Sequence, residues 1–208
     1  MGIFNQVTTI EKTAYHEAGH AVAAYLYGRR FLKISIIFDE KDFSLGRVIY
    51  PITYWKGFAP DGFKSNTRMR IEEEILKVFA GEVAEGLFSG RLNWRSSREH
   101  LTSAKKLARY VCGSQAEADA FVDWLWKREI HLMKDPPRRA AVQALAEELL
   151  QKKEIGYQEA RQIIEKAMVN CRKQEKASKQ NQESFLSSSL RTSISRSRLR
   201  RRTAILTR

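Results

Sequence analysis

Two of the four histidines lie four residues apart near the start of the chain, in the stretch TAYHEAGHAVAAYLYG (residues 13–28). An α-helix advances about 100° per residue, so His16 and His20 project from one face, about 40° apart and one turn apart along the axis. Both imidazoles can therefore bind the same metal ion. Glu17 is displaced by about 100° from His16, but its carboxylate can still reach a water molecule on that ion.

The pattern H-E-x-x-H is typical of zinc-dependent peptidases. Zinc lowers the pKa of a bound water to about 7, and a neighbouring carboxylate accepts the proton as the oxygen attacks a carbonyl carbon. The pattern therefore predicts His16 and His20 as Zn²⁺ ligands and Glu17 as the general base. The alternative is a coincidental pattern on a structural helix. The metal interpretation is favoured because both histidines lie off the apolar face of this helix, which carries Ala14, Ala18, Ala21, Val22 and Tyr25.

A catalytic zinc site needs a third protein ligand, and three residues are candidates. His100 lies on a predicted helix, within about 40° of Ala104 and so inside the buried stripe of that helix. Glu99 lies about 140° from Ala104, towards solvent. His131 follows a charged run near a helix end and is interpreted as a surface or capping histidine. For His100 the alternative is a core histidine that is hydrogen-bonded to a backbone carbonyl.

The elements that must position these residues are mostly helical. Thr8 and Glu11 have the spacing of a capping box, which predicts a first helix from about Thr9 to Tyr27. Two β-branched and aromatic stretches, 31–38 and 47–54, predict a β-hairpin, with Pro51 favouring an edge strand or a bulge. Further helices are predicted over 67–90, 97–111, 115–134, 138–153 and 157–174. We therefore expect a predominantly helical α+β fold: a metal-binding helix, a β-hairpin and a C-terminal helical bundle.

The net charge of +13 is concentrated at the C-terminal end. Residues 171–208 contain 11 Lys and Arg but two Asp and Glu, a net charge of +9. We predict one globular domain over 1–175 and a basic, Ser- and Arg-rich disordered tail over 176–208. A solubilising or incidental role is favoured for this tail; the alternative is contact with nucleic acid or another acidic partner.

The two cysteines, Cys112 and Cys171, are far apart and have no metal-type spacing, which is typical of reduced thiols in a cytoplasmic protein. The most apolar stretch near the start, AVAAYLY, is too short to span a bilayer, and no secretory leader opens the chain. A cytoplasmic location without a membrane segment is therefore expected.

Several stretches resemble, in order, the peptidase domain of the FtsH family of membrane-anchored AAA+ zinc proteases. AYHEAGHAV resembles its zinc helix and KISIIFDEKDFSLGRVIYP the hairpin that follows it. The remaining similar stretches are FAGEVAEGLFSG, SSREHLTSAKKLARYV and LAEELLQKKEIGYQEARQII. The resemblance covers about residues 10–168. It implies a zincin-like metal helix and zinc-dependent endopeptidase activity.

The third zinc ligand of that family is an Asp, and the matching position here is His100, four residues before Ala104. This is a departure, but histidine is a good zinc ligand, and the metal set expected is therefore His16, His20 and His100. Glu85 matches the first Glu of the family's A-A-E-E stretch. Two roles remain open for it: a solvated residue, or one that orients a ligand imidazole through its other N–H.

The phosphate loop G-x-x-x-x-G-K-[ST] of the family's ATPase motor does not occur. The expected activity is that of a zinc metalloendopeptidase, an FtsH-like hydrolase without its own ATPase, acting on unfolded or flexible polypeptides. The resemblance also implies a hexamer and an AAA+ ATPase partner acting in trans. The alternative is a catalytically idle zinc-binding module with a regulatory or interaction role.

Overall fold

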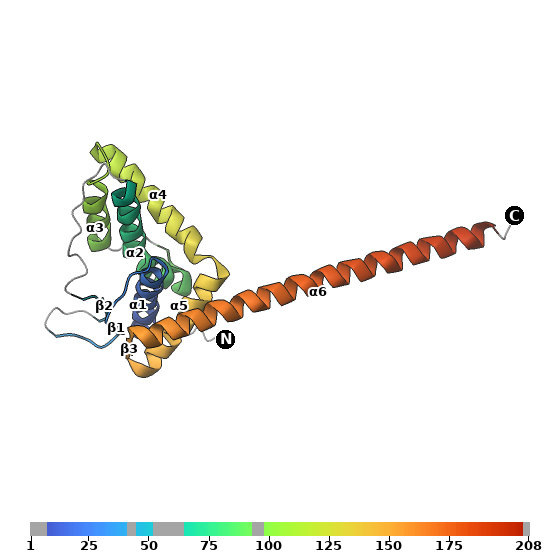
Figure 1. Ribbon diagram of the computed structural model, residues 1–208, viewed down its shortest axis with the longest axis horizontal. Helices are drawn as coiled ribbons and strands as arrows, with labels where there is room; N and C mark the ends of the chain where they lie inside the picture. The colour runs from blue at the N-terminus through green and yellow to red at the C-terminus, as the bar shows by residue number, and fades with distance from the viewer. Residues whose placement is uncertain (1–7, 41–44, 52–64, 93–97, 206–208) are drawn as a thin grey trace, which may run out of the picture. The chain divides into compact units, whose positions relative to one another are not determined.

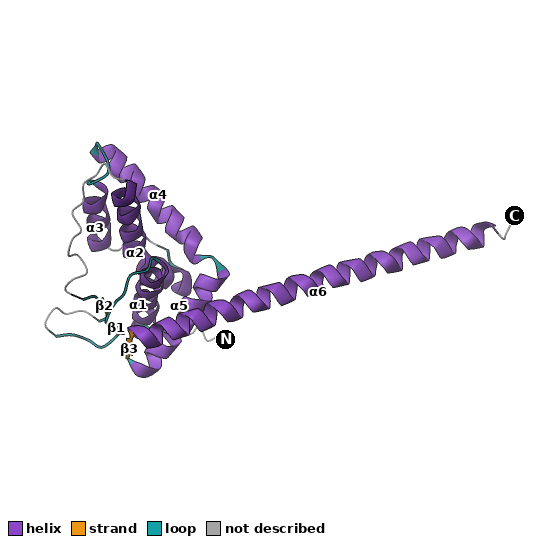
Figure 2. Ribbon diagram, in the orientation of Figure 1, coloured by secondary structure: helices purple, strands orange, loops and turns teal. Residues whose placement is uncertain are grey.

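The computed structural model describes residues 8–40, 45–51, 65–92 and 98–205 (Figure 1). Over these residues it contains six helices and three short strands, and loops or turns connect α3 to α4 and α4 to α5 (Figure 2). The elements are α1 (Thr9–Leu26), β1 (Lys33–Ser35), β2 (Arg47–Ile49), α2 (Ser65–Ser89), α3 (Arg98–Ala108), α4 (Gln115–Met133), α5 (Pro136–Lys152), β3 (Glu154–Gly156) and α6 (Tyr157–Ile205). The predicted class, a predominantly helical α+β fold, is confirmed.

The first helix begins where the capping box predicts. The Thr8 hydroxyl accepts a hydrogen bond from the Glu11 N–H at 3.3 Å, and the Glu11 carboxylate accepts one from the Thr8 N–H at 2.7 Å. These two bonds satisfy N–H groups that have no partner within the helix. The helix ends before Gly28, whose φ of +67° lies in the left-handed region that glycine adopts at little cost. The capped start fixes the position of the H-E-x-x-H turn along α1.

Helix α2 packs against α1, α3 and α4, and so forms the centre of the core (Figure 1). It approaches α1 closely because the contact is made of very small residues. A Cβ atom added at Gly19 would lie 2.5 Å from the carbonyl oxygen of Ala80 and 2.6 Å from the Cβ of Ala84. Phe79 of α2 packs edge-to-face on Trp126 of α4, with ring centroids 5.3 Å apart.

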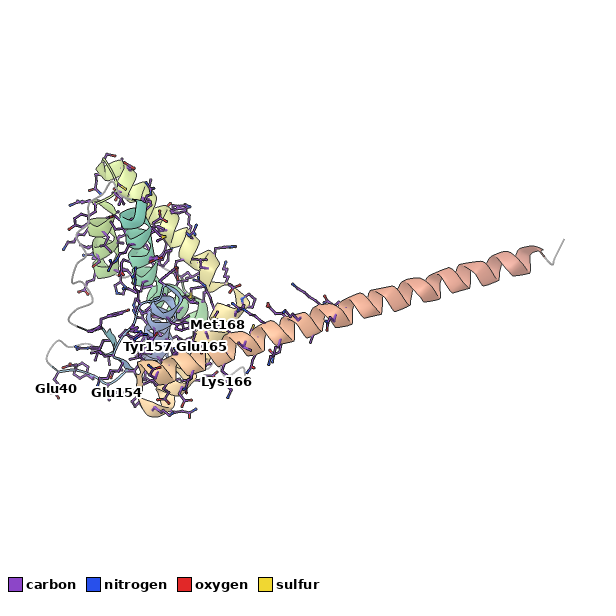
Figure 3. The ribbon with its side chains drawn as sticks, in the orientation of Figure 1. Glu40, Glu154, Tyr157, Glu165, Lys166 and Met168 are labelled. Atoms are coloured by element: carbon purple, nitrogen blue, oxygen red, sulfur yellow. The ribbon has the colours of Figure 1, made fainter. Side chains whose placement is uncertain are left out.

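The strands form one antiparallel sheet in the order β2-β1-β3. The predicted hairpin is present as β1 and β2, with Ile34 opposite Val48, although both strands are shorter than expected and residues 52–54 lie outside the described part. The sequence does not predict β3, because three residues between two helices are too few to show the alternation of apolar and polar side chains that is typical of a strand. Its Ile155 is buried opposite Ile34, and Glu154, labelled in Figure 3, pairs with Lys33 at 2.7 Å.

The chain divides into two units, residues 1–168 and 169–208. The boundary predicted from the sequence lies later, after residue 175. Helix α6 continues through most of the second unit, so residues 176–205 are helical in the structure and differ from the predicted disordered tail. The stretch Tyr157–Ile205 contains neither Gly nor Pro and is rich in Arg, Lys and Gln, which favour helix. The prediction of disorder relied on the absence of an apolar stripe, which reports on packing rather than on backbone propensity.

No helix among the described residues combines the length and the apolar character needed to cross a membrane.

A carboxyl group lies buried in the core away from the histidines. Glu129 of α4 has no exposed surface, and neither of its oxygens has a hydrogen-bond partner among the described residues. Burial raises its pKa to about 8, and the charges of Arg138 and Arg128 oppose this only in part. The native protein therefore keeps Glu129 protonated at a pH where the unfolded chain has already released that proton.

We expect the stability contributed by Glu129 to fall as pH rises from about 4.5 to 8. Over that range the native state binds the proton and the unfolded state does not, so the free energy of unfolding drops by up to about 1.4 kcal/mol per pH unit. Glu129→Gln should remove this pH dependence. The free energy of unfolding of the variant should therefore rise relative to that of the wild type between pH 5 and pH 8. Urea unfolding at pH 5 and at pH 8 measures this free energy, and Glu40→Gln, at an exposed residue, is the control. An unchanged pH profile in the Glu129 variant would contradict the expectation.

Candidate metal centre

Three imidazoles from two helices converge at one point. His16 and His20 extend from α1 and His100 from α3, and one ring nitrogen of each lies within 4.8 Å of the other two. The Nε2 atoms of His16 and His20 are 3.1 Å apart. The ring centroid of His100 lies 5.5 Å from that of His16 and 5.4 Å from that of His20. The structure thus brings together the three residues predicted as metal ligands.

Acceptor groups of helix α2 contact the Nδ1 atoms of the two α1 imidazoles. His20 Nδ1 lies 2.8 Å from the backbone carbonyl oxygen of Lys77, and His16 Nδ1 lies 3.2 Å from the Glu85 carboxylate. A carbonyl and a carboxylate can only accept hydrogen bonds, so each Nδ1 carries the hydrogen and donates it. The lone pairs of both rings are then on the Nε2 atoms that face each other. Of the two roles left open for Glu85, the geometry matches the one that orients a ligand imidazole.

The third imidazole is held in the same way by a residue that the sequence did not indicate. His100 Nδ1 lies 3.2 Å from the Glu82 carboxylate, again on α2. Glu82 is only 9% exposed, and within the described part of the chain its second oxygen is buried without a hydrogen-bond partner. It lies one turn before Glu85, so the spacing of the two glutamates on one helix was the available signal. Interpreting this spacing requires knowing that α2 packs against both α1 and α3.

The donor set fits a zinc ion. Two lone pairs 3.1 Å apart repel each other unless a proton or a metal ion lies between them. Burial, together with the charges of His16 and His100, holds the pKa of His20 well below its usual range, which keeps this ring neutral as metal binding requires. Burial would also lower the pKa of His16, but the hydrogen bond to Glu85 and the nearby carboxylates outweigh it and raise that pKa. Three imidazole nitrogens and one open position are a common arrangement for catalytic Zn²⁺.

Gly81 provides the space in which the imidazoles meet. A Cβ atom added there would lie 2.4 Å from His20 Nε2 and 2.8 Å from His16 Cδ2. Gly81 lies in the interior of α2, and the atoms that an added Cβ would meet belong to the imidazole rings, so the rings would have to move. This glycine therefore has a packing reason inside a helix, where it otherwise costs about 1 kcal/mol relative to alanine.

Glu17 lies in the same cavity as the three histidines and is 7% exposed. Burial raises its pKa to about 7, against the lowering effects of His16, His100 and Arg47 and of a hydrogen bond from the backbone of Val48. A carboxyl group with a pKa near neutrality can both accept and return a proton. This position agrees with the role predicted for it.

The other two candidates for the third ligand are not part of the cluster. Glu99 of α3 and His131 of α4 are both exposed, and neither belongs to the metal-type group found among the described residues. His131 lies in the last turn of α4, as expected for a surface or capping histidine.

The cavity over the imidazoles has a volume of about 370 Å³. One wall consists of β2 and the residues beside it, including Arg47, Val48 and Tyr50, and another includes Lys77 of α2. A neighbouring cavity of about 260 Å³ shares His16 and Glu17 and continues along the first turns of α1. Space is therefore available for a substrate on both sides of Glu17.

Comparison with known proteins adds no relative: no protein-family model matches the chain, and no curated protein sequence does either. The interpretation of the site depends on its own geometry and on the motifs in the sequence.

The third ligand can be tested by removing it. We expect His100→Ala to lower the zinc affinity by about 100-fold or more, because losing a ligand should cost at least as much as losing an outer hydrogen-bond partner. Metal analysis after dialysis, together with a competition titration, measures this. His131→Ala is the matched control and should keep full zinc. Full zinc occupancy in the His100 variant would contradict the assignment.

Gly81→Ala tests whether the space beneath the imidazoles is needed. The added methyl group would clash with His20 Nε2, so we expect a folded protein with zinc affinity reduced by about 10-fold or more. Circular dichroism checks the fold and the competition titration checks the affinity. Gly113→Ala is the control, because a Cβ there would meet a single atom at 3.6 Å. Equal zinc affinity in the Gly81 variant and the wild type would show that the rings can move aside.

Proposed function

We propose that the protein is a zinc-dependent metalloendopeptidase of FtsH type that hydrolyses peptide bonds in unfolded or flexible polypeptides. The observation that carries this proposal is the arrangement at the centre: three imidazoles with their lone pairs directed to one point, and a buried glutamate in the same cavity. A purely structural metal site has no need of a carboxyl group held beside an open cavity. The resemblance to FtsH peptidase domains supports the same conclusion.

Bound Zn²⁺ would be held by His16, His20 and His100, and would polarise the substrate carbonyl and lower the pKa of a water molecule. The residues of the chain do the rest. Glu85, Glu82 and the Lys77 carbonyl keep the rings in the tautomer that leaves Nε2 for the metal. Glu17 accepts a proton from the attacking water and then gives it to the nitrogen of the departing amine.

The cavity wall formed by β2 suggests how a polypeptide is held. β2 is at the edge of the sheet and lines the cavity through Arg47 and Val48. An extended segment can add to such an edge through main-chain hydrogen bonds, which do not depend on side-chain identity. β2 ends at Ile49, and Pro51 beyond it has no N–H to donate to a further strand. An extended substrate must be unfolded or flexible, which agrees with the proposed substrate class.

By the family resemblance we extend the proposal to an AAA+ ATPase partner acting in trans and to a hexameric assembly. The two free cysteines, Cys112 and Cys171, are consistent with a reducing compartment, and we propose the cytoplasm.

Glu17→Gln separates a peptidase from an idle zinc-binding module. The amide cannot accept the proton, so we expect unchanged zinc content and a loss of about 10²–10⁴-fold in cleavage rate. Casein cleavage and metal analysis on the same preparations measure both quantities. Glu99→Gln is the control on the exposed face of α3. A zinc-loaded wild type without any turnover would instead support the idle module, and full activity in the Glu17 variant would contradict the role of this residue.

A further inference from the structure

One requirement of the proposed reaction is not met by the residues discussed so far. When water adds to a peptide carbonyl, an electron pair of the C=O bond moves onto the oxygen, and the developing negative charge needs a hydrogen-bond donor. Such a donor must line the cavity that holds Glu17 and the three histidines. This inference rests on the proposed function.

Among the described residues that line that cavity, three besides the histidines have side chains that can donate: Arg47, Tyr50 and Lys77. The guanidinium of Arg47 lies 2.9 Å from Asp39, and the ammonium of Lys77 lies 2.5 Å from Glu74. Both cations are therefore already paired with carboxylates, and moving either to an oxyanion would leave its partner uncompensated.

Tyr50 differs because its donor is neutral and its ring is held in place. It lies two residues after Val48, just beyond the end of β2, and both side chains line the cavity. The Lys77 ammonium lies 4.7 Å from the centroid of the Tyr50 ring, a cation–π contact with a residue of α2. Burial, and then the charges of Glu74 and Glu17, raise the pKa of Tyr50, so the phenol keeps the proton that it donates.

We propose that the Tyr50 hydroxyl donates the hydrogen bond that stabilises the substrate oxyanion opposite Glu17. In this step Glu17 takes a proton from water, the water oxygen forms a bond to the carbonyl carbon, and the C=O electron pair moves onto the oxygen. Tyr50 donates its hydrogen bond to that oxygen and keeps its proton. When the C–N bond breaks, the C=O bond forms again and the nitrogen receives the proton from Glu17.

Tyr50→Phe tests this in the full-length, zinc-loaded protein. Removing one oxyanion donor should lower kcat by about 10²–10³-fold, with little change in KM and none in zinc content. A phosphinic peptide, which imitates the tetrahedral species, should bind more weakly by a similar factor. An uncleaved substrate peptide should bind Glu17→Gln equally well with and without the Tyr50 change. Tyr110→Phe, at a tyrosine that is 51% exposed, is the control and should alter none of these quantities.

The results separate this inference from the proposed function. An active wild type with an equally active Tyr50→Phe variant that binds the phosphinic peptide normally would overturn the role of Tyr50 alone. Loss of zinc, or equal weakening of substrate and phosphinic peptide, would make Tyr50 a structural or general binding residue and would also overturn it. A wild type that holds zinc but neither cleaves peptides nor binds the phosphinic peptide would overturn both.

Discussion

The candidate site depends on the close packing of α1 against α2. Gly19, on α1, has no Cβ that would meet Ala80, and Gly81, on α2, has none that would meet the imidazoles. At this separation acceptors of α2 reach the Nδ1 atoms of His16 and His20 at hydrogen-bond distance. A larger residue at either glycine would push the helices or the rings apart by about the width of a methyl group. Small residues in a helix contact, which contribute little apolar burial, are here what allows the polar contacts to form.

The acceptors on α2 also determine what the imidazoles can do. Each of the three histidines gives its Nδ1 hydrogen to an oxygen, which leaves a lone pair on the other nitrogen. A single lone pair of this kind in a protein core can accept a hydrogen bond from a water molecule or a hydroxyl group. Three of them directed to one point can be satisfied together by a single cation. The metal interpretation follows from the hydrogen-bond partners as much as from the H-E-x-x-H pattern.

The sequence was sufficient for the parts of this site that are encoded locally. The start of α1 follows from the Thr8 capping box, and the shared face of His16 and His20 follows from helix geometry. His100 could be preferred to Glu99 because helical phase separates a buried from an exposed position. Glu82 could not be found, since its role depends on how α2 is placed between α1 and α3. The strand β3 and the helical state of residues 176–205 were also missed, because neither leaves an apolar period to detect.

The charges around the centre give an independent reason for a cation there. Glu17 and Glu82 are 7% and 9% exposed, and Glu85 is hydrogen-bonded to the His16 ring, so three carboxyl groups lie close to the three imidazoles. Bringing carboxylates out of water is costly unless an opposite charge is close. Arg47 is the cation that contributes to Glu17, but it also pairs with Asp39. A divalent ion at the Nε2 atoms would offset this buried negative charge, lower the pKa of Glu17 and prepare it as a base. Metal binding and the ionisation of the Glu17 carboxyl group would then be two results of one electrostatic arrangement.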